Sequence, residues 1–274
     1  MDRALGPLLD DGIGIAQRAG TAIMDVYSGG AFETTHKADD SPLTAADLAA
    51  HRTIVAALDA RSPRYPVLSE ESRAIPFAER ATWDRYWLVD PLDGTKEFIA
   101  RNDQFTVNMA LIERGTPVLG VVHAPALGST FWAARGCGAF RRLAGGPVER
   151  IAVADYRGTT LQVVASRSHA GPFLPRFLAA LGEHELVSIG SSLKLCLIAD
   201  GSAHLYPRFG PTSEWDIAAA DAIVREAGGA VTDLDGAALR YNKPEILNPH
   251  FIAAGAPPFP WRPILDSLQA SENG

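Results

Sequence analysis

The segment WLVDPLDGTKEFI (residues 87–99) starts as a buried strand and continues into a tight turn. The apolar run Tyr86–Val89 is bounded by Asp and Pro, which is typical of a strand. Pro91 is expected to end the strand pairing. Gly94 is expected to let the backbone turn before Thr95, whose hydroxyl can cap the following helical turn. The segment therefore predicts a strand, a turn and a helix start in immediate succession.

Oxygen ligands gather where this strand ends. Asp90 and Asp93 are three residues apart, the Leu92 carbonyl lies between them, and backbone N–H groups follow. Oxygen atoms beside a helix N-terminus suit a hard metal ion and a phosphate group. A turn with two solvated aspartates is the plain alternative for a bare DxxD pattern, so the rest of the chain must decide between them.

Length and composition indicate a globular protein. The 274 residues suffice for a large core shared by two lobes, and 47% apolar with 21% charged residues argues against disorder. The net charge of −7 disfavours nucleic-acid binding through a basic surface but leaves room for a small anionic ligand in a cleft. The only two cysteines, Cys137 and Cys196, are expected to be buried free thiols in preference to a disulfide or a metal pair.

The sequence shows neither a secretory leader nor a membrane span. The N-terminus carries acidic residues where a signal peptide needs a basic start, and no stretch reaches about 18 apolar residues. Cytoplasmic residence is therefore expected.

The first half of the chain predicts an α+β lobe. Apolar residues recur at helical spacing from Leu5 to Tyr27, and a second helix opens at Thr44, where Thr44 and Asp47 have the spacing of a capping box. The polar stretch His36–Pro42 is expected to be a mobile loop. The expected strands are Tyr65–Leu68, Gln104–Glu113, Pro117–His123, Ser129–Ala134 and Gly138–Arg142.

The Gly-Gly-Pro sequence at residues 145–147 marks a predicted boundary between an N-terminal lobe (1–147) and a C-terminal lobe (148–274). Strands and helices alternate after it, which predicts a layered α/β lobe. The expected strands are Leu161–Ala165, Leu186–Ile189, His204–Tyr206, Ala230–Thr232 and Asn248–Ala254. The expected helices are Phe173–Leu181, Ser191–Ala199, Trp215–Ala227 and Trp261–Leu268.

Two further acidic residues complete a candidate metal site. Glu70 follows the strand Tyr65–Leu68, and Asp216 begins a helix rich in small residues. Alone, Glu70 is more often a surface residue and Asp216 a helix cap. With Asp90 and Asp93 they give four acidic side chains at element ends, and four buried like charges need cations. Mg²⁺ suits all-oxygen ligation, and a pair of metal ions suits phosphoryl transfer.

Together these motifs resemble a known phosphatase superfamily. DPLDGT, with SEES upstream and WDIAAA downstream, is similar to the lithium-sensitive, Mg²⁺-dependent phosphomonoesterases typified by inositol monophosphatase. That resemblance implies an α/β (α+β) fold, a layered αβαβα sandwich. DPLDGTKEFIARNDQFTVNMALI, ASRSH, SIGSSLKLCLIADG and LYPRFGPTSEWD more closely resemble the CysQ-type 3′(2′),5′-bisphosphate nucleotidases. Ala220 departs from the pattern, since the family usually has glycine there.

The resemblance implies a role for each matching residue around the metal ions. It places a first Mg²⁺ on Glu70, Asp90 and the Leu92 carbonyl, a second on Asp90, Asp93 and Asp216, and a weaker third near Glu70. The implied catalytic residues are Asp47, Glu70 and Thr95, of which Asp47 and Thr95 would orient the attacking water and help to deprotonate it. Backbone N–H groups of Gly94 and Thr95 would hold the scissile phosphate, and Lys37 matches a mobile lid.

Substrate contacts are implied mainly in the second lobe. The implied substrate-binding residues are Asp93, Gly94, Thr95, His169, Ser191, Lys194, Arg208 and Asp216. Read alone, the second-lobe members are a turn, a helix cap and a surface cation. A second phosphate needs a fixed cation, and Arg suits it geometrically, whereas an inositol-phosphate enzyme has less need of a Lys and Arg pair.

The resemblance therefore implies hydrolysis of the 3′-phosphate of adenosine 3′,5′-bisphosphate (PAP) to AMP and phosphate in sulfate assimilation. The sulfated nucleotide PAPS is an expected second substrate. The alternative is inositol monophosphatase or fructose-1,6-bisphosphatase activity on the same fold. A different class would be a catalytically silent phospho-ligand sensor, which would be free to lose Thr95 or Asp47. Superfamily members are often dimers, so a homodimer is consistent with the resemblance, although the sequence indicates no interface.

Overall fold

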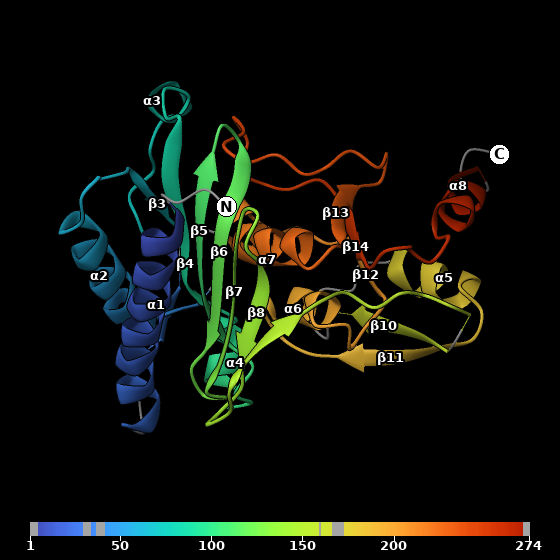
Figure 1. Cartoon of the computed structure of the whole chain (residues 1–274), viewed down its shortest axis with the longest axis horizontal. Helices are drawn as coiled ribbons and strands as arrows, with labels where there is room; N and C mark the ends of the chain where they lie inside the picture. Colours follow the sequence, from blue (N-terminus) through green and yellow to red (C-terminus); the bar gives the residue numbers. More distant parts are fainter. Residues whose placement is uncertain (1–4, 30–33, 37–41, 159, 166–172, 271–274) are drawn as a thin grey trace.

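The computed structural model describes residues 5–29, 34–36, 42–158, 160–165 and 173–270, and it forms five layers (Figure 1). From one side to the other these are a helical layer, a seven-stranded sheet, a second helical layer, a five-stranded sheet and a third helical layer. The helical layers are, in that order, α1 (Leu5–Ser28) with α2 (Ala45–Asp59), α6 (Leu193–Ala199) with α7 (Glu214–Glu226), and α5 (Phe173–Ala180) with α8 (Arg262–Ala270). The expected αβαβα sandwich is confirmed.

The seven-stranded sheet runs in chain order, and only its first pair of strands is parallel. Its strands are β3 (Val67–Ser69), β4 (Arg85–Asp93), β5 (Thr106–Glu113), β6 (Thr116–Ala124), β7 (Ser129–Ala134), β8 (Gly138–Arg142) and β9 (Val148–Ile151). The turn between β5 and β6 consists of Arg114 and Gly115, both with positive φ, which suits a two-residue hairpin turn. Because β9 belongs to this sheet, the first sheet extends past residue 147, and the division into two lobes stays a prediction.

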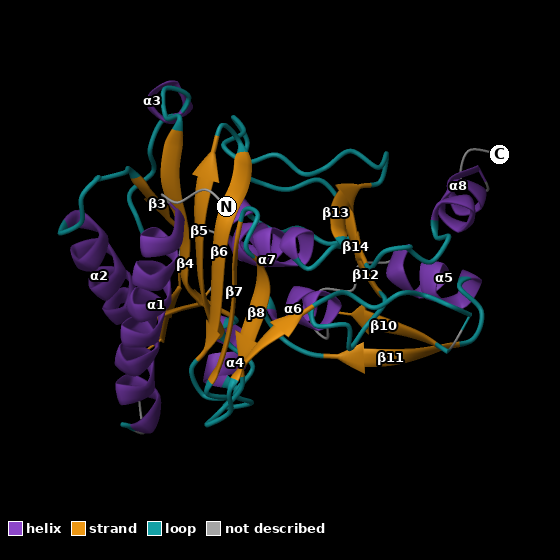
Figure 2. Cartoon of the chain, in the orientation of Figure 1, coloured by secondary structure: helices purple, strands orange, loops and turns teal. Residues whose placement is uncertain are grey.

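The five-stranded sheet has the order β11-β10-β12-β14-β13, with β10 parallel to both of its neighbours and β14 antiparallel to both of its own. Its strands are β10 (Leu161–Ala165), β11 (His184–Ser188), β12 (Leu205–Arg208), β13 (Ala230–Asp233) and β14 (Phe251–Ala254). Figure 2 shows the helices of this half alternating with its strands, as the sequence predicts. Within the described residues, no helix is both long and apolar enough to cross a bilayer.

The polar segment before α2 differs from the expected loop. Two three-residue strands, β1 (Thr34–His36) and β2 (Pro42–Thr44), pair antiparallel, so the two ends of the expected loop are strand residues. Strands this short carry no alternation of apolar and polar residues by which a sequence could reveal them. Residues 37–41, including Lys37, lie outside the described residues.

The end of β4 also differs from expectation, because Pro91 does not end the pairing. Asp90 pairs with Asn108, the register shifts, and pairing resumes between Asp93 and Thr106. Proline has no N–H to give to a ladder, so it is tolerated at such an irregularity. The expectation that Thr95 caps the next helix is wrong, since α4 (Thr95–Ile99) is preceded by Gly94 as its cap, with φ +92°.

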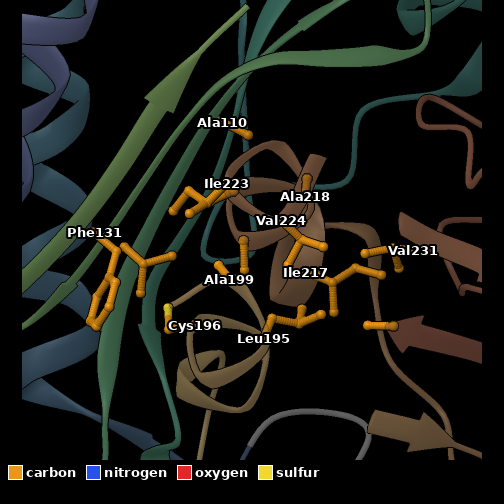
Figure 3. Packing of buried hydrophobic residues seen from close by; sticks show 14 of the residues in the cluster. Ala110, Phe131, Leu195, Cys196, Ala199, Ile217, Ala218, Ile223, Val224 and Val231 are labelled. Atoms are coloured by element: carbon orange, nitrogen blue, oxygen red, sulfur yellow. The ribbon is translucent and has the colours of Figure 1, made fainter. Parts of the chain in front are cut away.

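The two faces of the seven-stranded sheet bury different side chains. On β5, Val107, Met109 and Leu111 pack with α1 and α2, whereas Ala110 and Ile112 belong to the core that contains α6 and α7. This alternation follows from the two-residue period of a strand. Figure 3 shows the second core from close by, where Leu195, Cys196 and Ala199 of α6 lie near Ile217, Ala218 and Ile223 of α7.

Both cysteines are free thiols, as expected. Cys196 is buried in the core around α6 and α7, whereas Cys137 is only partly buried, so its expected full burial is wrong. Cys137 lies in the turn between β7 and β8, where the chain stays close to solvent.

Helix α7 lies directly against the sheet because a glycine faces it. A Cβ added to Gly120 on β6 would lie 2.0 Å from the carbonyl oxygen of Ala219 and 2.9 Å from the Cβ of Ala222. Such distances leave no room for a methyl group, so the backbone of α7 rests on the strand itself. The small residues of α7 thus lie where the helix comes closest to the sheet.

We expect Gly120→Ala to destabilise the protein by about 1–3 kcal/mol, because α7 must move away from the sheet. Gly6→Ala is the matched control, since its added Cβ meets no atom within 4 Å and alanine favours a helix. Urea unfolding of both variants measures the difference. Equal free energies of unfolding for Gly120→Ala and wild type would show that the close approach of α7 is not required.

Candidate active site

Three separate elements bring four acidic residues to one edge of the sandwich. Glu70 directly follows β3, and its N–H donates to the carbonyl of Val89 on β4 at 3.1 Å. Asp90 and Asp93 lie on the last part of β4, and Asp216 lies in the first turn of α7. Because β3 runs parallel to β4, Glu70 emerges beside Asp90, and their side chains form a hydrogen bond.

The carboxylates influence one another electrostatically. Burial raises the pKa of Asp90 well above its usual value, and the charges of Glu70, Asp93 and Asp216 raise it further. Burial also raises the pKa of Asp216 to about 8, with Asp93 and Glu70 as the next causes. For Asp93, burial raises the pKa to about 6, although the charge of Lys194 and hydrogen bonds from Ser192 and Asn108 lower it. Asp90, Asp93 and Asp216 therefore disfavour a state in which all three are charged.

This set of oxygen atoms fits a hard divalent cation. In the part of the chain that the structure describes, no three Asp, Glu, His or Cys side chains form a closed metal cluster. The carboxylates nevertheless lie close enough to raise one another's pKa values. A divalent cation would relieve this repulsion, and oxygen-only ligation is what Mg²⁺ prefers. Asp90, Asp93, Asp216 and Glu70 are the residues that would hold such an ion.

Asp47 links the N-terminus of α2 to Thr95. The Oδ2 atom of Asp47 accepts from the backbone N–H of Thr44 at 2.8 Å and from its hydroxyl at 2.6 Å, so the expected capping box is present. Its Oδ1 atom accepts from the hydroxyl of Thr95 at 3.3 Å. That hydroxyl also lies 3.4 Å from the carbonyl oxygen of Leu92. Asp47 is thus a helix cap and a partner of Thr95 at once.

A pocket of about 290 Å³ opens in front of the carboxylates. Of the residues that the sequence implicates in substrate binding, seven line it: Asp93, Gly94, Thr95, Ser191, Lys194, Arg208 and Asp216. The remaining one, His169, lies outside the described residues. Asp47, Glu70, Asp90 and Leu92 do not line the pocket. The lining therefore combines acidic side chains, here called the acidic wall (Asp93, Glu97 and Asp216), with cationic donors from α6 and β12, here called the second or cationic wall (Lys194 and Arg208).

The donors on this second wall are buried. Lys194 and Arg208 are 8% and 7% exposed, and burial lowers the pKa of Lys194 to about 8 although Asp93 acts to raise it. Arg208 donates through Nη2 to the carbonyl of Pro211 at 2.8 Å. Its Nε atom and the hydroxyl of Ser191 have no hydrogen-bond partner among the described residues. Buried donors without a partner are costly, so a ligand with acceptor oxygens would stabilise them.

Several residues at this site are not among those predicted from the sequence. Ser192 donates its N–H to Asp93 at 2.5 Å, and Asn108 and Thr106 contact Ser192. The pocket is also lined by Lys96, Glu97, Tyr206 and Thr212. A signal for Thr106 and Asn108 was available, because they are polar residues on one face of an otherwise apolar strand.

Known proteins are similar to this chain over most of its length. A family model described as the inositol monophosphatase family matches residues 6–261. The 3′(2′),5′-bisphosphate nucleotidase CysQ of Salmonella typhimurium is 52% identical over 245 residues, which cover 86% of this chain and 95% of that protein. The CysQ of Escherichia coli strain K12 is 51% identical over 252 residues, covering 89% and 98%.

Solved structures agree with the sequence relatives. The crystal structure of CysQ from Bacteroides thetaiotaomicron superposes with a TM-score of 0.80 at 42% identity, covering 91% of this chain and 97% of that one. The suhB protein of Bartonella henselae superposes with a TM-score of 0.76 at 27% identity, covering 95% and 96%. The resemblance first seen in the DPLDGT, SEES and WDIAAA motifs is confirmed. The chain belongs to the inositol monophosphatase family.

Proposed function

We propose that this protein hydrolyses the 3′-phosphate of adenosine 3′,5′-bisphosphate to give AMP and phosphate. The observation that carries the proposal is the two-walled pocket, in which Asp93 and Asp216 face the same space as Lys194 and Arg208. The acidic wall suits metal-assisted phosphate hydrolysis, and the cationic wall suits a second phosphate. The names of the relatives from Salmonella and Escherichia support this choice of substrate.

Mg²⁺ is the metal that the donor set fits, and the inositol monophosphatase family is generally Mg²⁺-dependent. In the proposed arrangement, Glu70, Asp90 and the Leu92 carbonyl would hold one ion, and Asp90, Asp93 and Asp216 would hold another. A third near Glu70 is part of the same proposal. When bound, the ions supply a more acidic water and neutralise charge on the transferred phosphoryl group.

The chain's own residues handle the proton of the attacking water. Asp47 is fixed because its Oδ2 atom accepts two hydrogen bonds from Thr44. Its Oδ1 atom accepts the hydroxyl hydrogen of Thr95, which would leave a lone pair of the Thr95 oxygen to accept from the attacking water. Thr95 can take the water's proton while passing its own to Asp47. The water oxygen then bonds to phosphorus, the bond from phosphorus to O3′ breaks, and O3′ takes a proton from a second water. The hydroxide left by that water takes up the proton held by Asp47, so the protons balance.

Substrate selection is proposed to lie in the second wall. Lys194, Arg208 and the Ser191 hydroxyl would contact the nucleotide and its 5′-phosphate, and Gly94 and Thr95 N–H groups would hold the scissile phosphate. A role for His169 stays a prediction. PAPS carries the same 3′-phosphate and is proposed as a second substrate, while cytoplasmic residence and a homodimer remain predictions from the sequence.

Phosphate release from a substrate panel tests the proposed function. With Mg²⁺ present, we expect kcat/KM for PAP to exceed the values for inositol 1-phosphate and fructose 1,6-bisphosphate. Faster turnover of inositol phosphate would instead support the alternative activity. Release of no phosphate from any of the three would support the sensor hypothesis.

The variant Arg208→Met locates the second phosphate within that panel. Wild type should prefer PAP to 3′-AMP, which lacks the 5′-phosphate, and the variant should lose about 10–100-fold of this preference because a charged hydrogen bond is removed. Its kcat for 3′-AMP should change little, which serves as the internal control for folding. An unchanged preference would mean that Arg208 does not bind the 5′-phosphate.

Removing the metal should destabilise the protein, and more so at higher pH. Carboxyl pKa values that are higher in the folded than in the unfolded protein mean that the folded state binds more protons. The free energy of unfolding then falls as pH rises from about 4 towards about 8. In EDTA we expect Tm to be higher at pH 6 than at pH 8.5. Excess MgCl₂ should raise Tm at pH 8.5 by several degrees.

Differential scanning calorimetry measures these Tm values, with NaCl of equal ionic strength as the control for screening. If MgCl₂ raised Tm no more than NaCl does at pH 8.5, the carboxylates would not form a metal site.

A further inference from the structure

A buried polar network lies between the acidic residues and the core. It consists of Thr106 and Asn108 on β5 and Ser192 at the start of α6, which are 0%, 1% and 4% exposed. The hydroxyl of Ser192 donates to Oδ1 of Asn108 at 2.7 Å, and the hydroxyl of Thr106, 3.2 Å from the same Oδ1, can donate either to it or to the Ser192 hydroxyl. The two hydroxyls lie 2.8 Å apart. Buried polar groups of this kind persist when all of them are satisfied.

These contacts define which way the amide of Asn108 points. Its Oδ1 atom faces two hydroxyl groups, and its Nδ2 atom lies 3.4 Å from Oδ2 of Asp93 and 3.4 Å from the backbone carbonyl of Asp216. A carboxylate and a carbonyl can only accept, so they require the NH₂ group on their side. Asn108 therefore directs one N–H to Asp93, at the end of β4, and the other to the backbone carbonyl of Asp216, in the first turn of α7.

Asp93 receives a second donor on the same oxygen. The backbone N–H of Ser192 donates to Oδ2 of Asp93 at 2.5 Å. With Ser192 and Asn108 both on Oδ2, the other carboxylate oxygen of Asp93 has neither of them as a partner and can bind a cation. Outer hydrogen bonds of this kind orient metal ligands and raise metal affinity.

The network is anchored to the sheet at a defined register. Asn108 is the cross-strand partner of Asp90, and Thr106 is the partner of Asp93, on either side of the irregularity at Pro91. This strand pairing thus fixes the position of Asn108 along the sheet relative to Asp90 and Asp93. The same side chain reaches α7 through the Asp216 carbonyl and α6 through Ser192.

We propose that Asn108, oriented by the hydroxyls of Thr106 and Ser192, is a positioning residue that presets Asp93 and Asp216 at the spacing a divalent cation requires. The proposal rests on the proposed function only in taking these two carboxylates as metal ligands. Asn108 itself touches neither metal nor substrate in this account. It holds Asp93 and the first turn of α7 in place before the ion binds, so that neither has to become ordered on binding.

Isothermal titration of metal-free protein with Mn²⁺ and Mg²⁺ tests this proposal directly. Asn108→Leu keeps a similar volume but removes both N–H donors, and we expect 10–100-fold weaker metal binding. Thr106→Val removes the orienting hydroxyl with nearly the same shape and should weaken binding in the same direction. Thr106→Ser keeps the hydroxyl and should bind metal within about twofold of wild type.

Steady-state kinetics add a readout that a purely structural role would not move. In Asn108→Leu and Thr106→Val, the Mg²⁺ concentration for half-maximal activity should rise by the same factor as the dissociation constant. The KM for PAP at saturating Mg²⁺ should stay near the wild-type value. A variant that is merely less stable would have a lower Tm with unchanged metal affinity, and that result would overturn the proposal.

Three possible outcomes distinguish a failure of this inference from a failure of the proposed function. If Asn108→Leu does not fold, the comparison of Thr106→Val with Thr106→Ser decides the matter, and equal metal affinities would overturn the proposal. If wild type does not hydrolyse PAP but these variants weaken metal binding, the proposed function fails and the inference stands. If wild type hydrolyses PAP and the variants bind metal as wild type does, the inference fails and the function stands.

Discussion

Repulsion among buried carboxylates is the constraint on which the rest of this structure depends. Burial raises the pKa values of Asp90, Asp93 and Asp216, and neighbouring carboxylates raise those of Asp90 and Asp216 further, because the folded chain brings acidic groups from β4 and α7 together beside Glu70. Such an arrangement costs stability unless a cation offsets it. The same groups therefore destabilise the protein without a metal ion and suit a metal-dependent reaction. The repulsion that destabilises the metal-free protein is relieved when a cation binds, so it contributes to the free energy of binding.

The layered sandwich explains how this arrangement persists. The seven-stranded sheet buries one face against α1 and α2, and this leaves its other face to receive α7 at backbone contact over Gly120. Asp216 lies near Asp93 because α7 packs this closely, and the side chain of Asn108 contacts both residues. The cationic donors of the pocket come from α6 and β12, and its acidic groups come from β4, α4 and α7. Groups of the seven-stranded sheet, the helical layer of α6 and α7, and the five-stranded sheet thus line one pocket.

The sequence predicts local features of this site well and long-range ones poorly. The capping box of Thr44 and Asp47, which starts α2, is visible from spacing alone. The continued pairing of β4 past Pro91 is not, because it depends on where β5 comes to lie. The contacts of Asn108 with Asp93 and Asp216 depend on the same pairing and on the position of α7. Three-residue strands such as β1 and β2 carry too few residues for any periodicity to emerge.

A crystal structure with bound metal tests the central claim most directly. Crystals soaked in Mg²⁺, with Mn²⁺ as an anomalous marker at the same positions, locate the ions without reference to activity. The account requires ions bridged by carboxylate oxygens of Asp90, Asp93 and Asp216, with Glu70 on the Asp90 side, at about 2.1 Å for Mg²⁺. Metal bound elsewhere, or these four side chains pointing in unrelated directions around a water-filled space, would contradict it.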